Sequence, residues 1–201
     1  MKHEFLDLIK QRRSRYDLTN QSTLPKDEIV QLLEQCVLHT PSPFNSQSTR
    51  VLLLCGARQA QFWQLVKHEL QSIISPENFA PTEEKLSAFA AAHGTILFFE
   101  DQRVVEALKA QFPTYKDHFA YWSNQANALT QFAVWTSLAE NGMGASLQHY
   151  NPLIDLEVHR QFHVSLDWKL MAQMPFGVPL SKHAPDKTFL PVKERVLVAC
   201  P

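Results

Sequence analysis

A run of 21 residues without a single charge, from Phe119 to Ala139, constrains the fold of this chain more than any other feature. Its length would cross a bilayer. However, eight Ser, Thr, Asn and Gln side chains interrupt it, a composition too polar for a helix in lipid. The run therefore predicts a central helix, over 114–141, that is buried on most sides and has polar faces near a ligand. Asn141-Gly142 is typical of its C-terminal cap.

The remaining composition favours one folded domain over residues 1–201. Hydrophobic residues make up 45% of the 201, which is enough for a sizeable core and excludes wholesale disorder. Lys and Arg number 19 against 20 Asp and Glu, so the net charge of −1 argues against a nucleic-acid partner. The N-terminus lacks an apolar signal core and the three cysteines are scattered, so we expect a cytoplasmic protein without disulfides or a membrane anchor.

Hydrophobic spacing predicts interleaved helices and strands rather than a regular βαβ series. Besides the central helix, we expect helices at 3–13, 25–40, 58–74, 82–92, 102–111 and 152–163, and strands at 51–55, 94–100, 145–150, 168–174 and 195–199. The continuous apolar run at 51–55 indicates a strand buried on both faces. The run at 195–199 needs a sheet edge in its own subunit or in a partner. The predicted fold class is α+β, a short mixed sheet with helices on both faces.

The first candidate site is Arg12-Arg13-Ser14-Arg15, where the opening helix is expected to end. The planar fork of arginine matches phosphate oxygens bidentately, and the Ser14 hydroxyl adds a donor. The alternative is that the arginines cap the helix C-terminus through its dipole. Taken alone, the cluster favours the capping role.

The second candidate is the loop Pro41-Ser-Pro-Phe-Asn-Ser-Gln47, which two prolines stiffen ahead of a strand. The carboxamides of Asn45 and Gln47 each offer a donor and an acceptor, which suits the edge of a heterocycle. The alternative is ordinary turn chemistry.

The third candidate is Gly142-Met-Gly-Ala-Ser-Leu-Gln-His-Tyr150, which holds two of only five glycines. It is not a dinucleotide fingerprint, because the third glycine is missing and it leads from a helix into a strand. Its small residues would instead let a flat ring approach the backbone closely.

Other chemistry finds less support. His159 and His163 are four residues apart, a spacing that suits a metal, but a third ligand is missing and no metal site is predicted. Cys36 lies on an apolar helix face and is predicted to be a small core residue. The nucleophile pattern Gly-x-Ser-x-Gly does not occur.

In their order along the chain, these segments resemble the FMN-dependent nitroreductase family over nearly the whole sequence. The resemblance is closest to a compact branch typified by the fungal fatty acid repression mutant protein. That branch carries strings like Gly94-Thr-Ile-Leu-Phe-Phe-Glu-Asp101, Ala145-Ser-Leu-Gln-His-Tyr-Asn-Pro152 and Gln173-Met-Pro-Phe-Gly177. The resemblance implies a three-layer α-β-α sandwich, a homodimer with two FMN sites at its interface, and a C-terminal tail that extends onto the partner subunit.

The resemblance also assigns roles to residues. Arg12, Arg13 and Ser14 would clamp the phosphate and ribityl chain, and Lys187 would close on the phosphate. The flavin ring would contact Asn45 and Gln47, with Ser42, Pro43 and Phe44 from the other subunit, and a strip near N5 formed by Ser146, Leu147, Gln148 and His149. Tyr16 stands where many members carry a lysine near the flavin pyrimidine, and tyrosine cannot supply that charge.

The implied activity is transfer of reducing equivalents from NADH or NADPH to a nitroaromatic or quinone-like acceptor in a ping-pong reaction. FMN carries such chemistry itself, so no catalytic side chain is predicted. Phe44, Phe119 and Trp122 are candidate walls of the acceptor slot, with core packing as the alternative. Two other functions stay open: a flavin-binding regulator of lipid or redox signalling with little turnover, and a hydrolase using Cys36 or a serine, which the spacing does not support.

Overall fold

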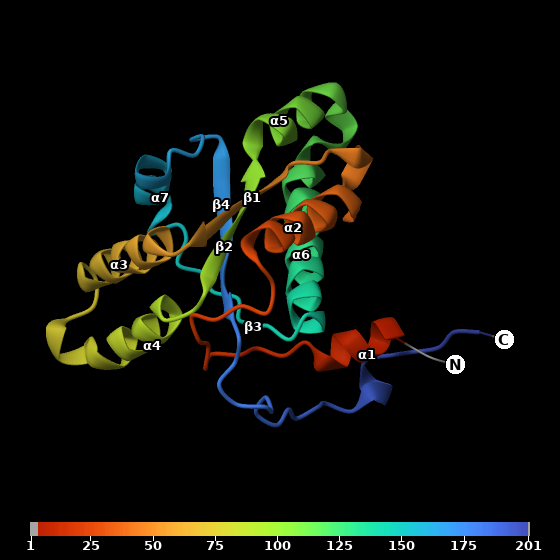
Figure 1. The fold of residues 1–201 in the computed structure, drawn as a ribbon. Helices are drawn as coiled ribbons and strands as arrows, with labels where there is room; N and C mark the ends of the chain where they lie inside the picture. The colour runs from red at the N-terminus through yellow and green to blue at the C-terminus, as the bar shows by residue number, and fades with distance from the viewer. Residues whose placement is uncertain (1–3, 201) are drawn as a thin grey trace.

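A computed structural model describes residues 4–200 of the chain (Figure 1). Its centre is a four-stranded sheet in the order β1-β2-β4-β3. The strands are β1 (Thr49–Cys55), β2 (Gly94–Asp101), β3 (Gly144–Ala145) and β4 (Trp168–Gly177). The sheet carries helices on both faces, as predicted, so the α+β class and the three-layer arrangement are confirmed.

The sheet is antiparallel throughout, so the prediction of a mixed sheet is wrong. Helices α3 (Ala57–Gln71) and α4 (Ala80–Ala90) run out and back between β1 and β2, so β2 begins beside the end of β1, with Gly94 opposite Cys55. A single crossover helix would instead have made the two strands parallel. Parallel pairing within residues 4–200 is confined to one isolated bridge, between Ser14 and Ala145.

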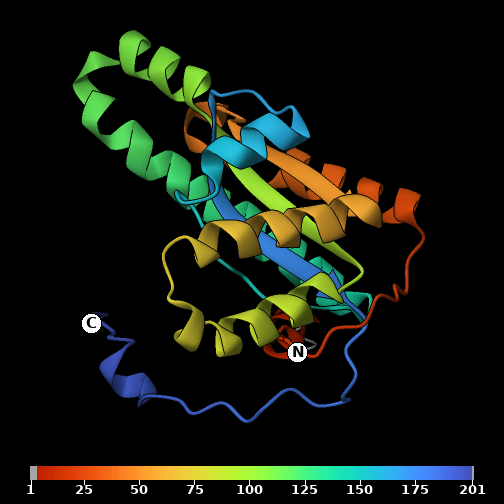
Figure 2. The same ribbon diagram turned by 90° about the vertical axis from the view of Figure 1, so that its left-hand side faces the viewer.

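Alternating side chains of β2 divide the core into two layers. Leu97 and Phe99 pack with helices α3, α4 and α7 (Asp155–Phe162). Ile96 and Phe98 pack with α2 (Lys26–His39) and α6 (Lys116–Glu140). Figure 2 shows the first group of helices in front of the sheet and the second behind it. All eight residues of β2 are buried, because both faces of this strand are covered.

Helix α6 confirms the central helix that the uncharged run predicts. It holds buried polar residues such as Asn127, Thr130 and Gln131 beside the apolar Val134. Within the described residues, no helix has both the length and the apolar character that a bilayer crossing needs. Gly142 follows α6 with a left-handed φ of 76°. The Gly142 N–H donates a hydrogen bond to the Ala139 carbonyl, and the Met143 N–H donates one to the Leu138 carbonyl. These two bonds form a Schellman cap, which confirms the predicted stop.

Two shorter helices complete the fold at the ends of α6. Helix α1 (Glu4–Gln11) lies across the C-terminal end of α6, and α5 (Gln102–Gln111) precedes its N-terminal end (Figure 1). The predicted helix at 102–111 is therefore confirmed. The predicted opening helix at 3–13 is two residues shorter at its C-terminus, and its residue 3 lies outside the described part of the chain.

Three strand predictions need correction. The strand at 51–55 is confirmed as part of β1, but its predicted burial on both faces is wrong. β1 is an edge strand and mostly half-buried, because only β2 pairs with it. The segment 145–150 contributes just the end of β3 and one further bridge, between Gln148 and Gln173. Residues 195–199 form no strand, and Val196, Leu197 and Val198 are exposed. Among residues 4–200, this tail pairs with neither of the two edge strands, β1 and β3.

Gly177 ends β4 where the chain has no space for a side chain. A Cβ there would lie 2.3 Å from the Thr19 carbonyl oxygen and 3.1 Å from the His93 nitrogen. Replacing Gly177 with Ala is expected to lower the free energy of unfolding by about 2–3 kcal/mol, because backbone atoms must move. Urea unfolding measures this loss. Gly142→Ala is the comparison variant without a clash, because its Cβ meets nothing closer than 3.7 Å; its expected cost of about 1 kcal/mol comes from the positive φ of 76° alone. Equal losses in the two variants would contradict the steric explanation.

Candidate functional site

The arginine segment lies against the C-terminal end of α6. Gln11, the last residue of α1, donates from Nε2 to the Ala139 carbonyl at 3.3 Å. The next residue, Arg12, places its guanidinium carbon 4.3 Å from the centre of the Trp135 ring. The packing of α1 against α6 therefore fixes where the arginine segment begins (Figure 1).

Arg12 and Arg13 have no counter-ion. Of the ion pairs formed among residues 4–200, none includes either residue. Arg13 donates only to the carbonyl oxygen of Pro185, and Nε of Arg12 is buried without a hydrogen-bond partner. Burial, and secondarily the charge of Arg13, lowers the pKa of Arg12. Neither guanidinium donates to a carbonyl of α1 in the described part of the chain. Two adjacent cations without a carboxylate partner there are suited to an incoming anion, and the dipole interaction with α1 is compatible with that role.

Arg15 has a different, structural role. It is buried and pairs with Asp17 at 2.9 Å, and its guanidinium also donates to the Ser181 hydroxyl at 2.9 Å. Burial by itself would raise the pKa of Asp17, but hydrogen bonds from Arg15 and Ser181 outweigh it and hold that pKa far below its ordinary value. These contacts attach the beginning of the C-terminal tail to the segment that follows α1.

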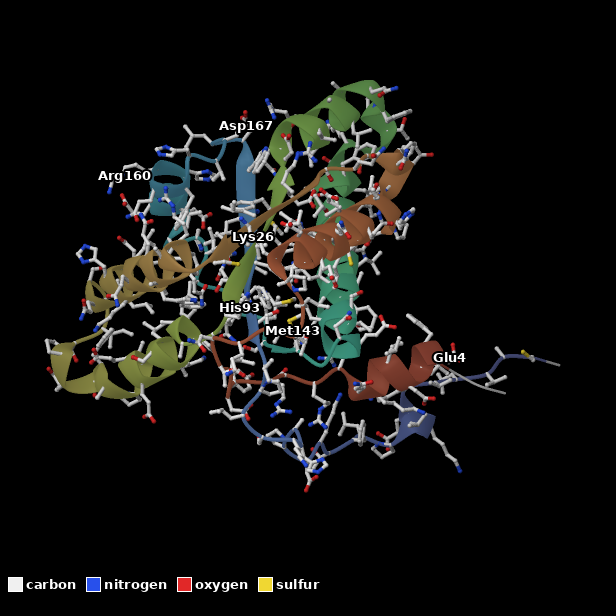
Figure 3. All side chains as sticks on the ribbon, viewed as in Figure 1. Glu4, Lys26, His93, Met143, Arg160 and Asp167 are labelled. Atoms are coloured by element: carbon white, nitrogen blue, oxygen red, sulfur yellow. The ribbon has the colours of Figure 1, made fainter. Side chains whose placement is uncertain are left out.

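The glycine-rich segment after α6 lies directly beside the arginine segment. Ser14 and Ala145 form the parallel bridge, and the Arg15 N–H donates to the Ala145 carbonyl at 2.9 Å. A Cβ on Gly144 would come within 2.8 Å of Arg15 Cβ, so only glycine allows this approach. Figure 3 labels Met143, just before this contact, and Glu4, at the start of α1. The structure thus brings together two of the three candidate motifs.

The strip 146–149 follows this contact and alternates between buried polar residues and more exposed ones. Ser146 and Gln148 are buried, and the Gln148 amide donates to the Ser146 hydroxyl at 3.1 Å. Leu147 is half-buried and His149 is exposed. Backbone bonds of 2.7 and 2.9 Å with Gln173 hold Gln148 against β4. The strip is a rigid wall with small and polar residues, suited to a flat ligand.

A cavity of about 510 Å³ lies between the arginine segment, the end of α6 and the tail. Its charged lining residues are Arg13, Arg15, Lys182 and Asp186, together with His183. Positive charge therefore dominates it, which favours an anionic ligand. Lys187 is exposed and lies outside this lining, with its ammonium 5.3 Å from the Phe189 ring.

The loop Ser42–Gln47 lies at the other end of α6. Phe44, Asn45 and Gln47 all adopt positive φ, at 54°, 51° and 50°. Such left-handed backbone is costly for residues other than glycine and is concentrated at functional sites. The Ser42 hydroxyl accepts the Gln47 N–H at 3.0 Å and stabilises the turn, while the Asn45 and Gln47 side chains stay exposed.

An apolar slot of about 430 Å³ opens beside this loop. Its lining includes Ser42, Pro43 and Phe44 from the loop and Trp122 and Leu129 from α6. The Phe44 ring lies 4.6 Å from that of Phe112 and 5.5 Å from that of Phe119. Phe44 and Trp122 are thus slot walls, whereas Phe119 is 1% exposed and packs in the core.

Within one chain, the loop does not meet the other two motifs. Trp122, beside the loop, and Trp135, beside Arg12, are thirteen residues apart on α6, a rise of about 20 Å. Tyr16 is exposed, and the Tyr16 ring lies 6.4 Å from that of Phe89. The predicted site is therefore divided between the two ends of one helix.

The remaining candidates are structural. Cys36 is buried in the core, as predicted, and burial raises the pKa of its thiol. Among residues 4–200, no three His, Cys, Asp or Glu side chains are grouped to hold a metal, and His159 and His163 are no exception. The sequence interpretation missed Trp135, because only the crossing of α1 over α6 brings it to Arg12.

Comparison with known proteins gives consistent matches. The model of the Nitroreductase family matches residues 9–178. Putative nitroreductase HBN1 of Saccharomyces cerevisiae is 30% identical over 190 residues, and nitroreductase FRM2 of the same yeast is 27% identical. Each alignment covers 92% of this chain and 93% of the relative. FRM2 is the fatty acid repression mutant protein, so the resemblance to its branch is confirmed.

Solved structures show the same fold. Nitroreductase CinD from Lactococcus lactis, in complex with chloramphenicol or with 4-nitrophenol, superposes with a TM-score of 0.88 at 40% identity. The match covers 97% of this chain and 99% of CinD. A nitroreductase from Desulfovibrio desulfuricans in complex with FMN shares the fold, with a TM-score of 0.71 at 16% identity over 99% of this chain and 98% of its own.

Proposed function

The chain belongs to the nitroreductase family, and on that premise we propose that this oxidoreductase uses FMN to pass reducing equivalents from NADH or NADPH to a nitroaromatic or quinone-like acceptor. The observation that carries the proposal is the pair Arg12 and Arg13, two adjacent cations to which residues 4–200 offer no counter-ion, beside a wall suited to a flat ring. An anionic flavin would supply the missing charge and the ring together.

The residues present fit FMN. Nε of Arg12 is a buried donor without an acceptor, which a phosphate oxygen would satisfy. Arg12, Arg13 and Ser14 would hold the phosphate and ribityl chain, with Lys187 of the tail as an additional cation. Ser146, Leu147, Gln148 and His149 would lie along the ring. When bound, FMN supplies the hydride chemistry, and the protein orients the reactants and excludes water.

The apolar slot is proposed to take both reactants in turn, which makes the kinetics ping-pong. Pro43, Phe44 and Trp122 offer flat apolar surfaces to a nicotinamide or an aromatic acceptor. Nitroreductase CinD, 40% identical to this chain, has been seen in complex with chloramphenicol and 4-nitrophenol, both nitroaromatics. That similarity supports a nitroaromatic acceptor for this chain.

A homodimer would unite the divided site. One face of α6 is exposed yet uncharged, with Tyr121, Asn124, Gln125, Ala128 and Leu129. Such a surface is typical of a contact with a second copy, and a two-fold axis beside α6 would bring together its opposite ends. Ser42, Pro43, Phe44, Asn45 and Gln47 of one subunit would then reach the flavin held by the other. A cytoplasmic location remains part of this proposal.

The C-terminal tail is proposed to extend onto the partner subunit. Beyond Pro185 it runs along one end of the molecule, away from the sheet, and is interrupted by one short 3-10 helix at Val192–Glu194 (Figure 2). Phe189, Leu190 and Val192 are each at least 66% exposed, and Leu197 is 87% exposed. An apolar segment of this length gains stability only against another surface, and in a dimer the partner supplies that surface.

Purification tests the proposed function directly. The protein is expected to be yellow, to release FMN rather than FAD on denaturation, and to hold about one FMN per chain because each subunit supplies one arginine segment. Absorbance spectra, chromatography of the released flavin and stepwise addition of NADH or NADPH measure this. Bleaching by the donor and recovery with 4-nitrophenol would support the reaction. A colourless protein that takes up no FMN would contradict the proposal.

One residue favours a second function, that of a flavin-binding regulator with little turnover. Tyr16 stands where many family members carry a lysine, and an uncharged side chain stabilises an anionic reduced flavin less. Steady-state oxidation of NADH and NADPH with several acceptors separates the two functions. A yellow protein without turnover would favour the regulator.

A further inference from the structure

Trp135 on α6 lies beneath the Arg12 guanidinium, at a distance that indicates a cation–π contact. The separation of 4.3 Å from the ring centre is well inside the ~6 Å range of such contacts. Gln11, bonded to Ala139 one turn further along α6, keeps the backbone before Arg12 in place. Arg12 is therefore positioned over a side chain that no binding motif in the sequence includes.

Both members of the stacked pair carry a donor that nothing satisfies. Nε of Arg12 and Nε1 of Trp135 are buried, and neither finds a hydrogen-bond acceptor among residues 4–200. Two N–H donors cannot satisfy each other. Because a buried donor without a partner costs free energy, an acceptor from outside residues 4–200 would stabilise this pair.

The acceptor must carry negative charge. Arg12 and Arg13 are adjacent in sequence, and no carboxylate pairs with either in the described part of the chain. The repulsion of Arg13 adds to burial in lowering the pKa of Arg12. An anion with several oxygens, such as a phosphate monoester, would satisfy both donors and compensate both charges.

We propose that Trp135 is part of the phosphate site: its ring holds Arg12 flat, and its indole N–H donates to the same anion. This inference rests on the proposed function, because the anion is taken to be the phosphate of FMN. Its consequence is selectivity. Trp135 would contribute to the binding of FMN and not to the binding of riboflavin, which has the same ring and no phosphate.

Two variants separate the two parts of this role. Trp135→Phe keeps an aromatic ring and removes the donor, so we expect FMN to bind about threefold to fivefold more weakly. Trp135→Leu removes both, so we expect about a tenfold to thirtyfold loss. The affinity for riboflavin should change less than about twofold in either variant, because a hydrogen bond to phosphate is absent there. Titration of apoprotein, with flavin fluorescence as the signal, measures all of these affinities.

The control is a second tryptophan that faces an arginine away from the site. The Trp168 ring lies 5.9 Å from the Arg50 guanidinium, and that arginine is paired with Asp101. Trp168→Leu is expected to leave the preference for FMN over riboflavin unchanged. Thermal unfolding of each apoprotein accounts for any loss of folded protein.

A double-mutant cycle shows whether Trp135 acts together with Arg12. Arg12→Lys keeps the charge and loses the flat fork, so in a Trp135→Leu background its effect on FMN binding should be smaller than in the wild type. Additive effects, or a wild-type preference for FMN in either Trp135 variant, would overturn the inference. Failure of the wild-type protein to bind any flavin would instead overturn the proposed function.

Discussion

Replacing Arg12 with Gln is expected to weaken FMN binding by about 30-fold to 150-fold, since hydrogen bonds to charged groups are worth about 1.5–3 kcal/mol and this variant loses the charge as well. The affinity for riboflavin should stay within about threefold, because only the phosphate contact is lost. Titration of the apoprotein with both flavins gives the two dissociation constants.

For the same variant, Arg12→Gln, we expect weaker FMN binding but no loss of apoprotein stability. Arg12 is half-buried without a counter-ion, and Nε is unsatisfied. Removal of this charge from the apoprotein should leave its unfolding temperature unchanged or raise it. Arg103→Gln is the matched control, since that arginine is exposed and paired with Asp101 at 3.0 Å. A fall in both stability and riboflavin affinity in Arg12→Gln would show a structural arginine instead.

Local patterns in the sequence predict most elements of this fold. The uncharged run predicts α6. Asn141-Gly142 predicts where that helix ends, because a Schellman cap is formed by residues that are neighbours in sequence. The apolar run Gly94–Glu100 gives β2, which is central and buried on both faces. Each of these features depends on spacing within one segment, and spacing is what hydrophobic periodicity measures.

The errors concern partners distant in sequence. The apolar run at 51–55 looks like a central strand, yet β1 lies at the edge of the sheet, and no pattern within a strand reveals its place in the sheet order. The antiparallel direction of β2 follows from the packing of α3 against α4, which the order of elements alone leaves open. The run at 195–199 has the composition of a strand but pairs with no edge strand of the described sheet.

The candidate site divides in the same way. Arginine forks and small residues have recognisable chemistry, and the structure places the segment that holds Ser14 beside Ala145, directly before the strip that begins at Ser146. Arg13 and Arg15 line the cavity there, and the binding roles of these residues stay predictions. The loop that holds Asn45 is also singled out, but one chain leaves it at the far end of α6. Trp135 escapes prediction, because a tryptophan on a central helix is indistinguishable from a core residue until α1 lies across it.

Ending the chain after Lys187 is expected to raise the dissociation constant of the proposed homodimer by at least about 100-fold, because each large apolar side chain that the partner would bury contributes about 1.5–3 kcal/mol. The truncation removes Phe189, Leu190 and Val192 as well as the run at 195–199, all exposed in the single chain. It keeps the Arg13 contact to Pro185 and the Arg15 contact to Ser181. Analytical ultracentrifugation over a range of concentrations measures the shift toward monomer.

A single substitution tests the contribution of the tail to the proposed dimer without shortening the chain. Leu197 is 87% exposed and packs on no core residue of its own subunit, so Leu197→Asp should leave a monomer's stability unchanged. On a partner surface, the same carboxylate would be buried without a counter-ion and should weaken the dimer by at least about tenfold. Leu166→Asp, at another highly exposed leucine, is the matched control. A Leu197→Asp dimer as tight as the control would show that the tail does not cross. In the proposed dimer the loop from Ser42 to Gln47 would reach the flavin held by the partner, so weaker dimers should also bind FMN less tightly, in proportion to the monomer present.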